Sequence, residues 1–216
     1  MDLIITALPF LLKAALITIF LAVVSMAIGL IIGLITALAR VSKNKLLYNI
    51  ATFYVSLIRG TPVLVQIYLV YFGLPQLGIT LGAMTSGIIA LSINTGAYLS
   101  ESFRAAILSV DKGQTEAAHS IGMTNWQSMR RIVIPQSVRT AIPTVGNTYI
   151  GLLKETSLVS VITVTELLYQ TTLIIAKTFQ PLTLYAAAAV IYWLICTGFN
   201  VFFTRLEKRS SRHLNI

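Results

Sequence analysis

The side chains of this 216-residue sequence that could bind a ligand are charged and polar residues set within long apolar stretches. Those that carry a charge are Arg59, Glu101, Arg104, Lys154 and Glu155. A charge in an apolar segment is costly unless it meets an opposite charge, water or a ligand. Glu101 and Arg104 have the three-residue spacing of a pair on one helix. The positive residues outnumber the negative ones, so ligand binding and structural pairing both stay open as interpretations.

Three polar residues in the same region follow a helical spacing. Asn94, Tyr98 and Glu101 occupy positions i, i+4 and i+7, so one face of a helix carries all three. Within a membrane that face has to meet protein or a water-filled cavity. Gln66 and Asn147 supply polar groups on neighbouring apolar segments. The pattern fits a cavity for a small polar molecule and hydrogen bonds between helices equally well.

A break in the fourth apolar segment adds a second type of binding group. Thr156 or Ser157 can cap a half-helix that runs through Val159–Leu168. The N-terminus of a half-helix inside a membrane presents free N–H groups that suit a carboxylate. Glu101, or less readily Glu155, suits an ammonium group. The predicted substrate-binding residues are Gln66, Asn94, Tyr98, Glu101, Asn147, Thr156 and Ser157.

The elements that must position these residues are membrane-spanning helices. Apolar residues make up 56% of the sequence and charged residues 11%, whereas a soluble domain has about 25% charged residues. A span needs about 20 mostly apolar residues. The stretches that reach this length are Ala14–Ala39, Leu46–Gly73, Leu77–Ser100, about 140–168, and Thr178–Thr204. We therefore predict an all-α polytopic membrane protein with five transmembrane helices, in which Pro62 kinks the second span near its middle.

The formal net charge of +9 indicates which side of the membrane each loop faces. Eleven Lys and Arg residues lie in segments 40–45, 109–139 and 205–216, whereas only Lys13 and Lys177 lie on the opposite side. Basic residues accumulate on the cytoplasmic side of a membrane. We therefore expect the C-terminus in the cytoplasm and the N-terminus outside, and the charge does not indicate a nucleic-acid partner.

The first span carries a stripe of small residues at every fourth position: Ser25, Gly29, Gly33 and Ala37. Such a stripe lets a second helix approach closely. Packing within the subunit is the favoured interpretation, and a contact between subunits is the alternative.

The longest polar segment, residues 109–136, is expected to form two short cytoplasmic helices. Asp111 can cap the first helix, and Gly122 suits the left-handed residue that ends it. Thr124 can cap the second helix, with Gln127 completing a capping box. A surface of little bulk, suited to another protein's groove, is offered by Ala117, Ala118 and Gly122, and Glu116 adds a charge for orientation.

The order of short motifs between residues 59 and 168 resembles that of one transporter family. Glu-Ala-Ala at 116–118, Gly122 and Ile-Val-Ile-Pro at 132–135 fit the EAA loop of ATP-binding cassette (ABC) importer permeases. Ile134 stands where leucine is usual, which keeps the position apolar. The motifs that resemble polar amino-acid permeases of the histidine, arginine and glutamine uptake type are Arg59–Pro62 with Gln66, Tyr98–Glu101 with Arg104, Gly113–Gln114, Pro135–Gln136 and Leu153–Leu158.

This resemblance implies a single transmembrane permease domain over residues 1–216 with the type I ABC importer permease fold. Residues 109–136 would carry the coupling helix, which sits in a cleft of a separate ABC ATPase that binds ATP and magnesium. The sequence has no Gly-Lys dipeptide and therefore no P-loop, so no cofactor is expected in this chain. The other implied partners are a second permease copy or paralogue (homodimer or heterodimer), an extracytoplasmic amino-acid-binding protein, the amino-acid substrate and membrane lipid.

We therefore expect a permease subunit of the bacterial inner membrane for polar amino acids, with a slight preference for basic ones. An ion-coupled secondary amino-acid transporter is the alternative, although it would usually show an internal repeat of spans, which this sequence lacks. An intramembrane enzyme is disfavoured because the only histidines, His119 and His213, lie in the expected cytoplasmic segments.

Overall fold

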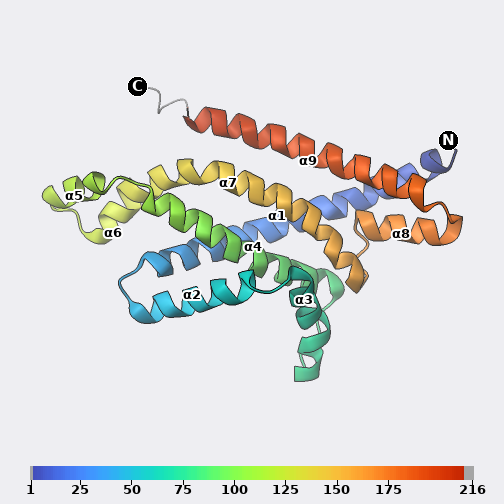
Figure 1. The fold of residues 1–216 in the computed structure, drawn as a ribbon, viewed down its shortest axis with the longest axis horizontal. Helices are drawn as coiled ribbons and strands as arrows, with labels where there is room; N and C mark the ends of the chain where they lie inside the picture. Colours follow the sequence, from blue (N-terminus) through green and yellow to red (C-terminus); the bar gives the residue numbers. More distant parts are fainter. Residues whose placement is uncertain (1, 212–216) are drawn as a thin grey trace.

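The computed structural model describes residues 2–211, and these residues form helices joined by short turns (Figure 1). The α-helices are α1 (Asp2–Val41), α2 (Lys45–Arg59), α3 (Val63–Tyr68), α4 (Ala83–Leu108), α5 (Lys112–Ser120), α6 (Asn125–Ser128), α7 (Ile134–Glu155), α8 (Leu167–Thr178) and α9 (Pro181–Ser211). Short π or 3-10 stretches occupy Leu69–Gly73, Leu74–Leu77, Met129–Val133 and Thr156–Ile162. The absence of strands from residues 2–211 agrees with the all-α prediction. Arg212 and His213 lie outside the described residues.

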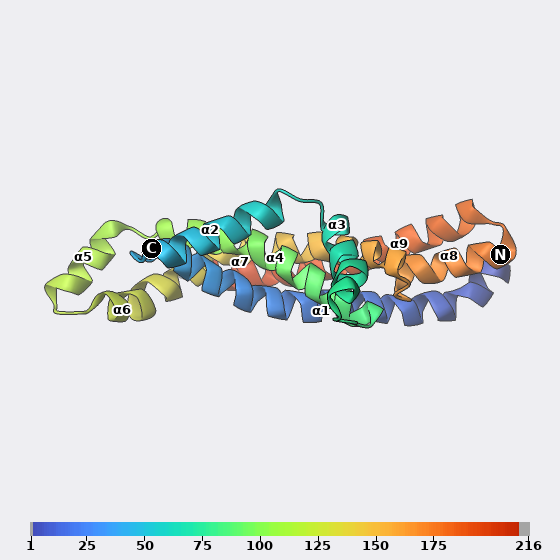
Figure 2. The same cartoon turned by 90° about the horizontal axis from the view of Figure 1, so that it is seen from below.

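Four long helices set the shape of the molecule. α1, α4, α7 and α9 run along one long axis, and α2 lies beside α1 (Figure 1). Figure 2 shows the same arrangement after a quarter turn. In both views α5 and α6 project at one end of the bundle, whereas α8 and the start of α1 lie at the other end. The segment that begins with α3 turns away from the bundle axis.

α4 is the central helix of the bundle. It packs against α1, α2, α3 and α7. Its Leu91 and Leu99 side chains are fully buried, and Leu152 and Leu153 of α7 belong to the same apolar core. Asn94 lies in the buried part of α4 with 4% of its surface exposed. Neighbouring helices therefore cover a polar face of α4 as well as an apolar one.

Length and composition identify fewer membrane-spanning helices than the predicted five. Two helices are long and apolar enough to cross a membrane alone, at Leu3–Val41 and Pro181–Lys208. Two bent pairs can each count as one further span, and they are Lys45–Arg59 with Val63–Leu77, and Asn125–Ile162 with Leu167–Thr178. The remaining expected span falls on α4, whose covered polar residues make it less apolar than a helix that faces lipid. The described residues thus support two to four spans by length and composition, and the count of five stays a prediction.

The small residues of α1 serve packing within the chain. A Cβ atom added at Gly33 would lie 2.8 Å from Leu99 Cβ and 3.1 Å from the carbonyl oxygen of Gly96. Ser25 and Ala37 of the same stripe are fully buried. α1 and α4 approach this closely because Gly33 has no side chain. The stripe therefore packs within the subunit, in agreement with the favoured interpretation of the sequence.

Gly33→Ala should destabilise the bundle, because the added methyl group would meet Leu99 Cβ and the α4 backbone. We expect a loss of about 1–3 kcal/mol, as in other overpacked cores, seen as a lower midpoint of thermal unfolding in detergent. Gly198→Ala on α9 is the matched control, since a Cβ atom there meets nothing within 4 Å. An unchanged midpoint for Gly33→Ala, or an equal fall for the control, would contradict this account of the α1–α4 contact.

Candidate functional site

The break between α2 and α3 is caused by Pro62. Because Pro62 has no N–H, the carbonyl oxygen of Ile58 lacks the donor that a continuing helix would provide. The Gln66 side chain replaces it: Nε2 donates to Ile58 O at 2.8 Å, to Thr61 O at 3.1 Å and to Thr61 Oγ1 at 2.9 Å. The two halves of this bent span meet at 103°. The predicted kink at Pro62 is confirmed in position, and it is a complete break between α2 and α3.

The other end of the Gln66 side chain reaches α4. Gln66 Oε1 accepts a hydrogen bond from Asn94 Nδ2 at 3.0 Å. Both side chains are buried. The amide nitrogen and oxygen of Gln66 are therefore both engaged within the protein, whereas Asn94 Oδ1 receives no hydrogen bond from any residue that the structure describes.

A small cavity lies between α4 and α7. Its volume is about 140 Å³, and the residues that line it are Asn94, Thr95, Tyr98, Thr148, Gly151, Leu152 and Glu155. The cavity brings together Asn94 and Tyr98, which the helical spacing placed on one face of α4. Glu155, which the sequence analysis ranked behind Glu101, supplies a carboxylate from α7. Both walls of the cavity thus carry a hydrogen-bond acceptor: the carboxamide oxygen of Asn94 on α4 and the carboxylate of Glu155 on α7.

The other predicted substrate-binding residues do not line this cavity. Gln66 lies outside the cavity lining and accepts a hydrogen bond from Asn94. Glu101 lies in an ion-pair cluster, and Asn147 is exposed on α7. Contact of these residues with a substrate stays a prediction.

The predicted capping of a half-helix by Thr156 or Ser157 is wrong. Their hydroxyl groups donate to the carbonyl oxygens of Leu153 and Lys154 at 2.8 and 2.7 Å. Both residues belong to a 3-10 stretch that directly continues α7. The chain breaks later, at Thr163, which has a left-handed backbone with φ of 66°. A new helix begins only after this break at Thr163.

Glu166, which the sequence analysis did not identify, caps that new helix, α8. Its fully buried carboxylate accepts hydrogen bonds from Leu168 N at 2.9 Å, Tyr169 N at 2.8 Å and the Tyr192 hydroxyl of α9 at 2.7 Å. Leu167 N donates to the hydroxyl of Thr18 on α1. An acidic residue directly before an apolar helix was the available sequence signal. The first N–H groups of α8 are therefore engaged by protein and do not form a carboxylate site.

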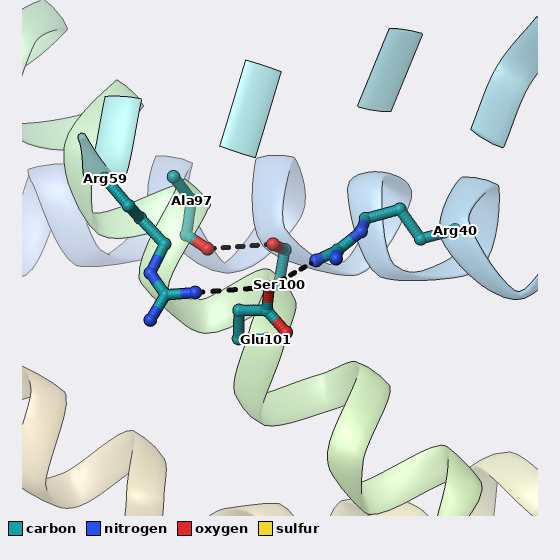
Figure 3. Close-up of polar contacts among 5 residues, drawn as sticks. All are labelled: Arg40, Arg59, Ala97, Ser100 and Glu101. Carbon is teal, nitrogen blue, oxygen red and sulfur yellow. Dashed lines mark hydrogen bonds and ion pairs between the residues drawn. The ribbon is translucent and has the colours of Figure 1, made fainter. Parts of the chain in front are cut away.

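Three helices meet at the carboxylate of Glu101 (Figure 3). Its Oε1 lies 2.7 Å from Arg40 Nη1 on α1 and 3.1 Å from Arg59 Nη1 at the end of α2. The Arg59 guanidinium lies over the Tyr98 ring, 5.2 Å from the ring centre, as a cation–π contact. The predicted pair of Glu101 with Arg104 on the same helix gives way to these partners from α1 and α2. The cluster thereby supports Tyr98, a residue of the cavity wall.

Residues 109–136 contain two capped helix starts, as predicted, but the second helix is not short, because α6 continues directly through Met129–Val133 into α7. The Asp111 side chain accepts from Gly113 N at 2.7 Å at the start of α5. Gly122 follows α5 with φ of +81°. Thr124 and Gln127 form a reciprocal capping box at α6. Local sequence rules therefore account for the shape of this loop.

The outer surface of the loop differs in part from the expected one. Glu116, Ala117 and Gly122 are exposed, whereas Ala118 is only 2% exposed and packs inward. Ile121 and Trp126 are 74% and 63% exposed. The loop therefore presents two large apolar side chains next to a carboxylate, which is typical of a surface that another protein covers. We call Glu116, Ala117, Ile121, Gly122 and Trp126 the loop surface.

Known proteins share both the sequence and the fold. Residues 29–212 match the family described as "Binding-protein-dependent transport system inner membrane component". The chain is 43% identical over 206 residues to the probable amino-acid ABC transporter permease protein YckA of Bacillus subtilis (strain 168), with 95% of this chain and 91% of that protein covered. It is 45% identical over 198 residues to the L-cystine transport system permease protein TcyB of the same organism, with 91% and 85% covered.

A crystal structure of an amino acid ABC transporter with histidines superposes with a TM-score of 0.90. Its sequence is 38% identical, and the match covers 95% of this chain and 96% of that one. Sequence and fold thus agree over nearly the whole length. The chain belongs to the family of binding-protein-dependent transport system inner membrane components and, within it, to the amino-acid ABC transporter permeases.

Proposed function

We propose that the cavity between α4 and α7 holds a polar amino acid while an ATP-driven importer moves it across the inner membrane. The observation that carries this proposal is that Asn94 and Glu155 lie on opposite walls of one half-open cavity between α4 and α7. Transporters bind their substrates at such polar positions within the membrane. No observation favours the ion-coupled alternative.

The chemistry of the cavity favours a ligand that donates hydrogen bonds. The Glu155 carboxylate and Asn94 Oδ1 are acceptors, so an α-ammonium group or a basic side chain suits them. The Tyr98 hydroxyl can donate to a carboxylate or to a polar side chain. The name of the relative TcyB, an L-cystine permease, supports polar amino acids as the substrate class. Basic amino acids fit the Glu155 carboxylate best.

The loop surface is proposed to dock against a separate ATPase subunit, which would bind ATP and magnesium. Exposed Ile121 and Trp126 supply apolar contact area, and Glu116 supplies a charge for orientation. A second permease copy or a paralogue would complete the pathway, and an extracytoplasmic binding protein would deliver the amino acid. The family description, which specifies binding-protein-dependent transport, supports these partners.

The end of the bundle that carries α5 and α6 is proposed to face the cytoplasm. The α1–α2 turn, with Lys43 and Lys45, lies at this end, whereas Lys177 at the end of α8 lies at the opposite one (Figure 1). Basic residues favour the cytoplasmic side. The N-terminus would then lie outside and the C-terminus inside.

Glu155→Gln should weaken binding of a basic amino acid, because the variant keeps the shape of the side chain but loses its charge. A hydrogen bond to a charged group is worth about 1.5–3 kcal/mol, so we expect the Kd for L-arginine to rise about tenfold or more. The measurement is binding of radiolabelled L-arginine to the purified permease–ATPase complex. L-Glutamine and L-histidine, tested in parallel, show whether the effect depends on side-chain charge.

Glu101→Gln is the comparison variant for this test. It neutralises another carboxylate of the bundle, but one that pairs with Arg40, whose side chain is only 10% exposed. We expect Glu101→Gln mainly to lower the midpoint of thermal unfolding, because an arginine is left without its partner. A greater loss of affinity in Glu101→Gln than in Glu155→Gln would contradict the proposed cavity.

Gly122→Asp should leave the permease folded but impair its association with the ATPase. A Cβ atom at Gly122 meets nothing within 4 Å, so the added carboxylate would project from the loop surface. We expect loss of ATPase co-purification and of substrate-stimulated ATP hydrolysis.

Gly78→Asp is the matched control for the loop surface. Gly78 has φ of +82° and equally open surroundings, so both substitutions carry the same backbone strain. Gly78 lies after α3, away from α5 and α6 (Figure 1). Equal co-purification of the ATPase with Gly122→Asp and with the wild-type protein would count against docking at the loop surface.

A further inference from the structure

We propose that Gln66 is a positioning residue, which fixes the Asn94 carboxamide so that its oxygen and not its NH₂ group faces the substrate. This inference rests on the proposed function of the cavity between α4 and α7. It gives that cavity a specific basis for preferring ligands with a free ammonium group.

The first step is the orientation of Gln66, which the backbone determines. The carbonyl oxygens of Ile58 and Thr61 lie 2.8 and 3.1 Å from one end of the Gln66 carboxamide. A carbonyl oxygen can only accept, so that end must be the NH₂ group. Pro62 has no N–H that could donate to Ile58 O. Thr61 O lacks its usual helical donor as well, because Val65 N donates to Pro62 O instead, at 3.0 Å. Turning the amide over would place its oxygen against two acceptors in a buried site, which is unfavourable.

The second step is the orientation of Asn94, which follows from that of Gln66. Gln66 Oε1 is now the atom that faces Asn94, and it can only accept. The Asn94 atom at 3.0 Å must therefore be Nδ2. Asn94 is 4% exposed, and its Nδ2 atom is engaged by Gln66. Oδ1 remains without a donor in the described part of the chain, in a residue that lines the cavity.

The consequence is a cavity with a fixed pattern of acceptors. A carboxamide that could turn freely would offer its NH₂ group to a carboxylate as readily as its oxygen to an ammonium group. With Gln66 in place, Asn94 Oδ1 joins the Glu155 carboxylate in favouring an ammonium donor. Gln66 thus sets selectivity without touching the ligand.

The test compares a free amino acid with the same molecule lacking its α-ammonium group, using the purified permease–ATPase complex. The ligand pairs are L-arginine with 5-guanidinopentanoate, and L-glutamine with glutaramate. For Gln66→Met we expect the affinity for the free amino acid to fall about tenfold, as for loss of one hydrogen bond to a charged group. The affinity for the analogue should change by less than about twofold, because the analogue lacks the α-ammonium group that is proposed to donate to Asn94 Oδ1.

Two further variants separate positioning from a general structural role. The double variant Gln66→Asn with Asn94→Gln moves one methylene group across the pair and keeps the order of donors and acceptors, so it should restore the selectivity. Asn94→Leu keeps the Gln66 bonds to Ile58 and Thr61 but removes the acceptor, so it should lose selectivity even if Gln66→Met fails to assemble.

The outcomes distinguish this inference from the proposed function. Parallel loss of affinity for both members of a pair in Gln66→Met, or retained selectivity in Asn94→Leu, would overturn the inference alone. Absence of binding of either amino acid to the wild-type complex would overturn the proposed cavity and this inference together.

Discussion

The missing N–H of Pro62 is the constraint on which the centre of this molecule depends. Within a membrane no water replaces a lost backbone hydrogen bond, so the Ile58 carbonyl oxygen needs a donor from the protein itself. Gln66 provides that donor and, with its other end, holds Asn94. The break in the second span and the wall of the candidate cavity are therefore parts of one hydrogen-bonded unit, and neither can be altered without disturbing the other.

A second set of contacts, made by residues that precede the α2–α3 break, supports the α4 wall of the cavity. Arg59 ends α2, pairs with Glu101 and lies over Tyr98, while Arg40 brings α1 into the cluster. Asn94 and Tyr98 are thus both tied to residues that flank the α2–α3 break. α4, which carries both of them, continues through a short turn into α5 and the loop surface. A displacement of the loop surface would therefore be transmitted to the cavity wall through α4.

The sequence predicted those features that depend on neighbours along the chain. The caps at Asp111 and Thr124, the left-handed Gly122 and the break at Pro62 all follow from interactions within a few residues. The family motifs in turn predicted the fold and the membership of the ABC permeases, because they extend over half of the chain.

Features that depend on residues far apart in sequence were predicted less well. The partner of Glu101 is Arg40, 61 residues away, rather than nearby Arg104. Glu166, at the start of α8, accepts a hydrogen bond from Tyr192, 26 residues away, because α8 packs against α9. Gln66 and Asn94 were predicted as ligand contacts, whereas their bond to each other depends on how α3 approaches α4.

The position of the bound amino acid can be determined by electron cryomicroscopy of the permease–ATPase complex with L-arginine. We expect density for the ligand between α4 and α7, with its α-ammonium group within hydrogen-bond distance of Asn94 Oδ1 and an ammonium or guanidinium group within hydrogen-bond distance of the Glu155 carboxylate. Density for the amino acid at a position that contacts neither side chain would contradict the account.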